Sequence, residues 1–133
     1  MSAGRLRPVV ADGASRGTGG YTPALIAGDY VFVSGQGPLD PETLAVRGAT
    51  VAQQTRHTLE NVVALVRAAG GTAQDIVRCT CYLASIDSFA EFTAAYEAFF
   101  AHDPRPTRTT IGCQLDGILV EIDCIAYVPR AGG

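Results

Sequence analysis

The sequence predicts an α+β fold: one domain, residues 1–133, in which two helices pack on one face of a mixed β-sheet. Three observations predict it. Segments with strand-like alternation occupy both ends of the chain, two segments with helical spacing of apolar residues lie between them, and no linker or repeat divides the chain. With 133 residues, 47% of them hydrophobic, the chain is long enough to bury a single core.

Strands are predicted in the first third of the chain. Residues 6–10, 22–27 and 30–34 are rich in β-branched, aromatic or other apolar residues, which is typical of strands. Gly28 and Asp29 separate the last two segments and predict a tight turn between them. We therefore expect the fold to begin with a meander.

The first helix is predicted over residues 51–69, where apolar residues recur at helical spacing. Thr50 is a suitable N-cap because its hydroxyl can accept a hydrogen bond from a free amide of the first turn. The Gly pair at 70–71 suits the end of the helix.

A strand and a second helix follow. Residues 76–83 are predicted as a strand with two cysteines, Cys79 and Cys81, on one face together with Val77 and Leu83. The second helix is predicted over about residues 88–100, with its aromatic residues on one side, and the prolines that follow prevent its continuation.

The last two strand-like segments set a cation and a carboxylate among β-branched residues. In residues 119–128, alternation puts an unbroken apolar row on one face and Glu121 on the other. In residues 108–113, Arg108 likewise falls opposite the more apolar face. If both apolar faces point toward the helices, Arg108 and Glu121 share the face turned away from them.

Composition alone favours water as the neighbour of that second face, since half-solvated sheets are ordinary. The carboxylates of Glu121 and Asp123 share this face with three apolar or aromatic side chains: Leu119, Ile125 and Tyr127. A mixture of this kind predicts a subunit interface with a site in it.

Charge and composition bear on the partners. The net charge is −3, the chain has no basic run and no Trp, and it has no Lys that could form a Schiff base. Clustered Lys and Arg are what binds phosphates, so no nucleic-acid partner is expected. Residues 1–10 contain no apolar targeting segment and no stretch approaches membrane-spanning length, so we expect a cytoplasmic protein without a membrane partner.

No metal and no cofactor are expected. The four cysteines fall on apolar faces and are predicted to be buried structural thiols, because a free Cys behaves as a small hydrophobe. His57 and His102 lack the spacing of metal ligands. No Gly-rich phosphate loop is present.

Several motifs occur in a fixed order along nearly the whole chain. They are Ser34-Gly35-Gln36-Gly37-Pro38 after a strand, Gln54-Thr55-Arg56 with Leu59-Glu60-Asn61, Tyr96-Glu97-Ala98-Phe99-Phe100, Pro106-Thr107-Arg108-Thr109-Thr110, and Val120-Glu121-Ile122. Together they resemble the Rid family, the YjgF-like deaminases of reactive enamine and imine intermediates.

The resemblance implies a chorismate-mutase-like subunit that assembles as a homotrimer, with clefts at the interfaces. It also implies that the last two strands are not hairpin neighbours. The implied reaction is hydrolysis of a 2-aminoacrylate or 2-iminopropanoate type of substrate to a 2-oxo acid and ammonia, without a cofactor.

The resemblance also implies roles for individual residues. Arg108 would bind the substrate carboxylate through two parallel hydrogen bonds, and Glu121 would hold and activate water. Gly35 would offer backbone close to the ligand, and Tyr21 would line the cleft. Each has a simpler explanation: an ion pair of Arg108 with Glu121 or Asp123, a Tyr21 that covers the sheet, and a Gly35 that serves only its turn.

Departures from the family pattern bear on the substrate. Thr93 and Thr110 stand at substrate-lining positions where relatives often have Asn and, in some members, Cys. Residues 114–118 form a shorter link than usual, and Gly20 begins a segment that also differs. A hydrolase specific for a larger acid of the aminomuconate type therefore stays open. A non-catalytic trimer that binds small carboxylates and a ribonuclease-like relative stay open as well.

Overall fold

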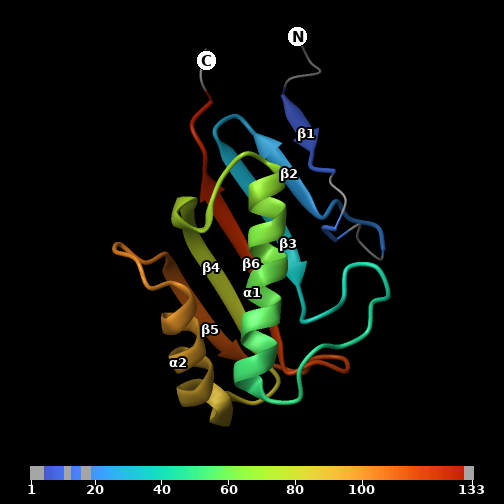
Figure 1. Cartoon of the computed structure of the whole chain (residues 1–133), viewed down its shortest axis with the longest axis vertical. Coiled ribbons are helices and arrows are strands. Elements are labelled where there is room, and N and C mark those ends of the chain that lie inside the picture. The colour runs from blue at the N-terminus through green and yellow to red at the C-terminus, as the bar shows by residue number, and fades with distance from the viewer. Residues whose placement is uncertain (1–4, 11–12, 16–18, 131–133) are drawn as a thin grey trace.

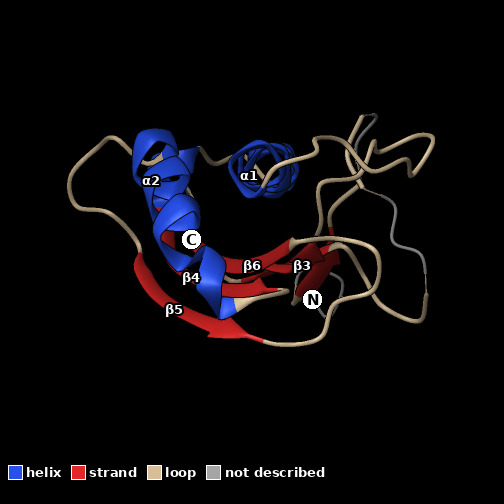
Figure 2. Cartoon of the chain, turned by 90° about the horizontal axis from the view of Figure 1, so that it is seen from below, coloured by secondary structure: helices blue, strands red, loops and turns tan. Residues whose placement is uncertain are grey.

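The computed structural model describes residues 5–10, 13–15 and 19–130. It has two layers, a twisted sheet and a pair of helices that cover one face of it (Figures 1 and 2). The strands are β1 Leu6–Pro8, β2 Ala24–Ala27, β3 Tyr30–Gln36, β4 Ile76–Leu83, β5 Thr107–Gly112 and β6 Val120–Tyr127. The helices are α1 Val51–Ala68 and α2 Phe89–Phe99, with short 3₁₀ turns η2 Ala73–Asp75 and η3 Ile86–Ser88.

The sheet has the strand order β1-β2-β3-β6-β4-β5. Only the pairing of β4 with β5 is parallel among these strands, and the other neighbours are antiparallel. The sequence-based expectation that β5 and β6 are not hairpin neighbours is confirmed, because β4 lies between them. The predicted α+β fold with two helices on one face of a mixed sheet is confirmed as well.

Helix α1 begins as its sequence predicts. The Thr50 hydroxyl accepts from the Gln53 amide at 3.1 Å, and the Gln53 side chain accepts from the Thr50 amide at 3.3 Å, which forms a capping box. Beyond its end, Gly70 has φ +95°, a conformation that residues with a Cβ rarely adopt. The apolar side of α1 packs on β6 and β3 and supplies the fully buried Leu59 and Val62.

Strand β6 forms the centre of the sheet, and its two faces are those that alternation predicts. Val120, Ile122 and Ala126 are completely buried beneath the helices. Glu121 and Asp123 lie on the other side, which we call the open face: the sheet surface turned away from α1 and α2.

The predicted orientation of β5 is wrong. Arg108 pairs in register with Cys79 on β4, and Cys79 pairs with Cys124 on β6. Both cysteines are buried under the helices, so Arg108 faces α2 rather than the open face. Ile111, on the supposed core side, is instead 42% exposed.

Two smaller differences have local causes. The register of β4 shifts between Ile76 and Arg78. Val77 was predicted to face the core, but this irregularity turns its side chain outward. Strand β2 starts at Ala24 instead of residue 22, since Pro23 has no amide for the ladder, although its carbonyl accepts from the Ser34 amide at 2.9 Å.

In the part of the chain that the structure describes, neither helix has the length and apolar character needed to cross a bilayer.

Candidate functional site

The predicted site residues fall into two groups on opposite sides of the sheet. Tyr21, Gly35 and Glu121 gather around the open face. Arg108 and Thr93 meet on the side of α2, and the other predicted position, Thr110, shares their side because it follows Arg108 by two residues on β5. The expectation that Arg108 and Glu121 share one face of the subunit is therefore wrong.

The open-face group is built where β3 and β6 run side by side. A Cβ at Gly35 would collide with the carboxylate of Glu121, so the side chain of Glu121 lies directly against the backbone of β3. Only a residue without a side chain permits this approach. Gly35 therefore serves the placement of Glu121 as well as its own turn.

Tyr21 is brought to this place by the chain just before β2. The Ser34 hydroxyl donates to the Thr22 carbonyl at 2.6 Å, which ties the segment after Tyr21 to β3. Tyr21 is 45% exposed. It borders a hollow of about 540 Å³ on the open face, lined by Tyr21, Thr22, Leu25, Phe32, Val33, Ser34, Gly35 and Asp123.

Burial sets the electrostatics of Glu121. Loss of solvent raises the pKa of its carboxyl above the ordinary value, and the negative charge of Asp123 on the same strand face raises that pKa further. Asp123 in turn accepts a hydrogen bond from the Tyr82 hydroxyl at 3.0 Å. A carboxylate with a raised pKa is a stronger base than an ordinary one and is therefore suited to accept a proton from water.

Two residues that support this group were not singled out from the sequence. Tyr82 carries no motif and is recognisable only from its register opposite Glu121. Asn61 on α1 donates to the carbonyls of Gly37 at 2.9 Å and Leu39 at 2.8 Å, and so anchors the chain that leaves Gly35. Its place within the Leu59-Glu60-Asn61 motif was the one sequence signal for it.

The guanidinium of Arg108 is enclosed by three rings of α2. Its central carbon lies 4.9 Å from the ring centre of Tyr96, 5.4 Å from that of Phe89 and 5.5 Å from that of Phe92. Cation–π attraction to these rings holds the group without occupying its N–H donors. Sequence reasoning treated these aromatic residues as one packed side of a helix and missed their contact with Arg108.

Most donors of Arg108 remain available. Among the described residues its side chain makes one hydrogen bond, from Nη2 to the Thr93 hydroxyl at 3.4 Å, and it takes part in no ion pair. The ion pair with Glu121 or Asp123 considered from the sequence is therefore not made within a subunit. The Thr110 hydroxyl is buried and has no hydrogen-bond partner among these residues.

The four cysteines were predicted to be buried, and this is confirmed for all of them except Cys113. Cys79, Cys81 and Cys124 are buried, Cys113 is half-buried, and all four are free. Burial raises the pKa of Cys79 to about 11 and raises the pKa of Cys81 and Cys124 as well. These three thiols are protonated at neutral pH, so none supplies a thiolate nucleophile next to Arg108.

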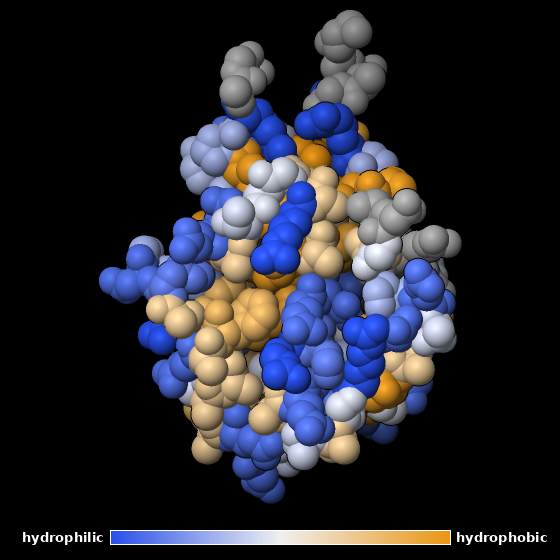
Figure 3. All heavy atoms as spheres, in the orientation of Figure 1, coloured by the Kyte–Doolittle hydropathy of each residue, from blue (hydrophilic) through white to orange (hydrophobic). Residues whose placement is uncertain are grey.

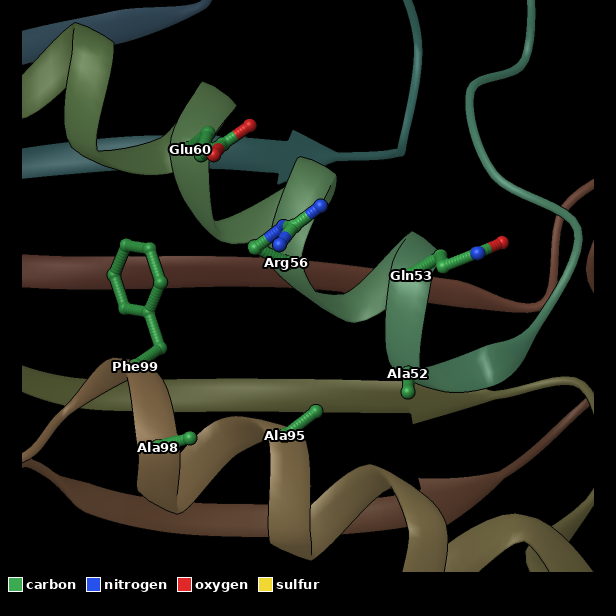
Figure 4. A pocket seen from close by; sticks show the side chains of 7 residues that line it. All are labelled: Ala52, Gln53, Arg56, Glu60, Ala95, Ala98 and Phe99. Atoms are coloured by element: carbon green, nitrogen blue, oxygen red, sulfur yellow. The ribbon is translucent and has the colours of Figure 1, made fainter.

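A separate groove of about 660 Å³ lies between α1 and α2 on the outer surface. It is lined by Ala52, Gln53, Arg56, Glu60, Ala95, Ala98 and Phe99 (Figure 4). On the helix-bearing surface, hydrophilic side chains gather along α1 and more apolar ones over α2 (Figure 3). None of the predicted site residues lines this groove, and it lies on the far side of the helices from the open face.

Within the described ranges, no group of three or more His, Cys, Asp or Glu side chains is placed to hold a metal ion.

Known proteins resemble this chain over nearly its full length. The endoribonuclease L-PSP family matches residues 13–128. A 2-iminobutanoate/2-iminopropanoate deaminase of Salmonella typhimurium is 35% identical over 124 residues, which cover 90% of this chain and 96% of that protein.

Solved structures agree. The YjgF gene product of E. coli is 34% identical, with a TM-score of 0.83, and the match covers 91% of this chain and 98% of that one. E. coli TdcF with bound serine is 32% identical at the same TM-score of 0.83 and the same coverage, 91% and 98%. These matches and the motifs of its sequence show that the chain belongs to the Rid family of YjgF-like proteins, a family also described as endoribonuclease L-PSP.

Proposed function

We propose that the protein hydrolyses 2-imino acids, and the enamines that tautomerise to them, to 2-oxo acids and ammonia. The observation that carries the proposal is the Arg108 guanidinium, fixed by three aromatic rings with most of its donors unused. A planar cation of this kind suits a carboxylate, which it can bind through two parallel hydrogen bonds. The relative named as an imine deaminase supports the same class of substrate.

Glu121 is the proposed partner in the chemistry. Its carboxylate takes a proton from water, and the water oxygen forms a bond to the imine carbon. The nitrogen gains that proton, which gives a carbinolamine. The new hydroxyl group then gives up its own proton, which passes through the Glu121 carboxylate to the nitrogen, and the carbon–nitrogen bond breaks as the carbonyl forms. One water is consumed, and the products are the 2-oxo acid and one ammonia.

The two groups come from different copies of the chain in this proposal. Within one subunit, Arg108 faces α2 and Glu121 faces away from the helices, so the sheet separates them. A substrate that touches both must therefore lie between two subunits. A closed homotrimer, in which each copy offers its β5 edge to the open face of the next, meets this need with three equivalent sites.

A protein that only binds small carboxylates is the second candidate. The bound serine of TdcF favours it, since serine also carries a carboxylate that a cation can hold. In that case Arg108 still binds the carboxylate, and Glu121 takes no part in a reaction.

The test is release of ammonia from imino acids made in situ by an amino-acid oxidase. Replacing Arg108 by Ala removes the charged hydrogen bonds to the carboxylate and is expected to lower kcat/KM by about 10- to 100-fold, mainly through KM. Arg108→Lys keeps the charge but not the paired donors, so it restores only part of the loss.

The matched control is Arg56→Ala, which removes an arginine from the outer groove and is expected to leave the rate unchanged. A folded wild-type protein that accelerates hydrolysis of none of these acids, while still binding their stable 2-oxo analogues, would favour the binding protein instead.

A further inference from the structure

Two short rows of residues face each other at the edge of the sheet. The first row, on the helix-facing side of β5, is Arg108, Thr110 and Gly112. The second, at the start of α2 and in η3 before it, is Thr93, Phe89 and Ile86.

The two rows are in contact at both ends. At one end Arg108 donates to Thr93 and lies over the Phe89 ring. At the other, a Cβ built on Gly112 would come within 3.0 Å of the Cβ of Ile86. The rows therefore run side by side from the guanidinium to Ile86 and pack against each other at that end, so a ligand held by Arg108 would extend along their outer side.

The solvent-facing wall along this direction is apolar. Of the three rings around Arg108, Phe92 and Tyr96 are 0% and 3% exposed, whereas Phe89 is 42% exposed. Ile86, one helical turn earlier, is 52% exposed. Phe89 is therefore the most exposed of the three rings that contact Arg108, and a ligand bound to Arg108 can place its remaining atoms against Phe89 and Ile86.

The two rows offer no second cation. Arg108 is the only cation of the two rows, and neither row contains a carboxylate. Nearby Arg105 on the loop before β5 is occupied, because its Nε donates to the Phe100 carbonyl at 2.7 Å. An acid with a second carboxylate would leave that group beside Phe89 and Ile86 without a partner, which is costly in a partly desolvated place.

We infer that Phe89 is a specificity-determining residue, and that with Ile86 it selects 2-imino acids with bulky apolar side chains, branched or aromatic, over small or acidic ones. The inference rests on the proposed function for its reaction, but it concerns a different part of the site. The apolar side chain of the substrate lies against the exposed ring of Phe89 while Arg108 holds the carboxylate.

The test compares imino acids derived from alanine, leucine, phenylalanine and glutamate by amino-acid oxidases. Wild type is expected to prefer the leucine and phenylalanine derivatives to the glutamate derivative by about tenfold or more in kcat/KM. In Phe89→Ala, kcat/KM for the two bulky acids is expected to fall at least about tenfold further than for the alanine derivative, through KM. Phe89→Leu keeps an apolar wall and should restore most of the preference.

Two controls separate a specificity role from a structural one. Leu6→Ala removes another exposed apolar side chain, which lies on β1 and is 60% exposed, and should change no preference. Light scattering reports whether Phe89→Ala assembles as wild type does. An equal loss on all four acids, or an altered mass of the assembly, would overturn the inference and leave the proposed function standing. Wild-type inactivity on every acid would overturn both.

Discussion

Arg108 and Glu121 are both charged groups in partly buried surroundings, and the protein stabilises them by different means. The cation is compensated by the negative faces of three rings and by one hydroxyl. Burial raises the pKa of the Glu121 carboxyl, and the negative charge of Asp123 raises it further. The first arrangement favours binding of an anion, and the second favours acceptance of a proton.

The raised pKa of Glu121 predicts how activity depends on pH. A general base works only when deprotonated, so kcat/KM should fall on acidification at a pH above the ordinary carboxyl pKa of about 4.5. Asp123→Asn removes the repelling charge, so the fall of kcat/KM on acidification (the acid limb of the pH profile) should move to lower pH. Glu121→Gln should abolish this acid limb together with most of the rate. The measurement is kcat/KM against pH for the three proteins.

The same shift has a consequence for stability with the opposite sign to that of an ion-paired carboxylate. Because the folded-state pKa of Glu121 is raised, its contribution to stability is fully present below its unfolded pKa and is lost as pH rises through the folded pKa. Glu121→Gln should therefore melt at a higher temperature than wild type at pH 7, and the difference should vanish in acid. If kcat/KM of Asp123→Asn fell at the same pH as that of wild type, the charge of Asp123 would not contribute to the raised pKa of Glu121.

At the scale of elements, the approach of β3 to β6 fixes where the Glu121 carboxylate can lie. Gly35→Ala places a methyl group where that carboxylate stands, and the carboxylate can yield because it is the end of a flexible side chain. We expect a folded protein with nearly wild-type melting temperature and a kcat reduced by about tenfold or more, since small misplacements of a reacting group are costly.

The control for this substitution is Gly20→Ala, where an added Cβ meets nothing within 4 Å. It should leave both kcat and melting temperature unchanged. Full activity of Gly35→Ala would show that the position of Glu121 against β3 does not matter for the reaction.

The elements that sequence patterns predicted best are those whose burial is one-sided and complete. Helix α1 has a regular apolar stripe and a capping box, and β6 has neighbours on both edges and helices over one face. In such elements the apolar residues must face the core, so periodicity determines orientation. Thr50 and the buried row of β6 were predicted correctly for this reason.

Strand β5 shows where that reasoning fails. It lies at the edge of the sheet, and six residues give alternation little weight. The helix-facing side of β5 carries Arg108, and the long side chain of Arg108 brings its charged end to the rings of α2 instead of keeping it away from the apolar layer. Counting apolar residues on each face assigned Arg108 to the wrong side, and no local pattern in the sequence reports a contact with a distant aromatic cluster.

The candidate site was predictable only in part for a related reason. The family resemblance assigned Arg108, Glu121, Gly35 and Tyr21 to one cleft at a subunit interface, but it did not place Arg108 and Glu121 on opposite sides of the sheet. The two sides of the sheet become distinct only with the register of β5 against β4. Tyr82 and Asn61 enter through register and loop contacts, which depend on the whole fold.

At the scale of the whole molecule, the surface of the sheet favours assembly. The open face carries exposed aromatic residues, Tyr30, Phe32 and Tyr127, each between 43% and 46% exposed, next to the hollow bordered by Tyr21. An apolar surface of this kind suits burial against another copy. The proposed trimer covers it and brings Arg108 of one copy to Glu121 of the next.

The most direct measurement is complementation between two inactive variants. Arg108→Ala and Glu121→Gln are co-expressed with different affinity tags, and assemblies that contain both kinds of chain are isolated. In a closed trimer, each mixed assembly has one interface where an intact Arg108 faces an intact Glu121, so about one third of wild-type activity per trimer should return. Mixed assemblies no more active than the two parent variants would contradict a site shared between subunits.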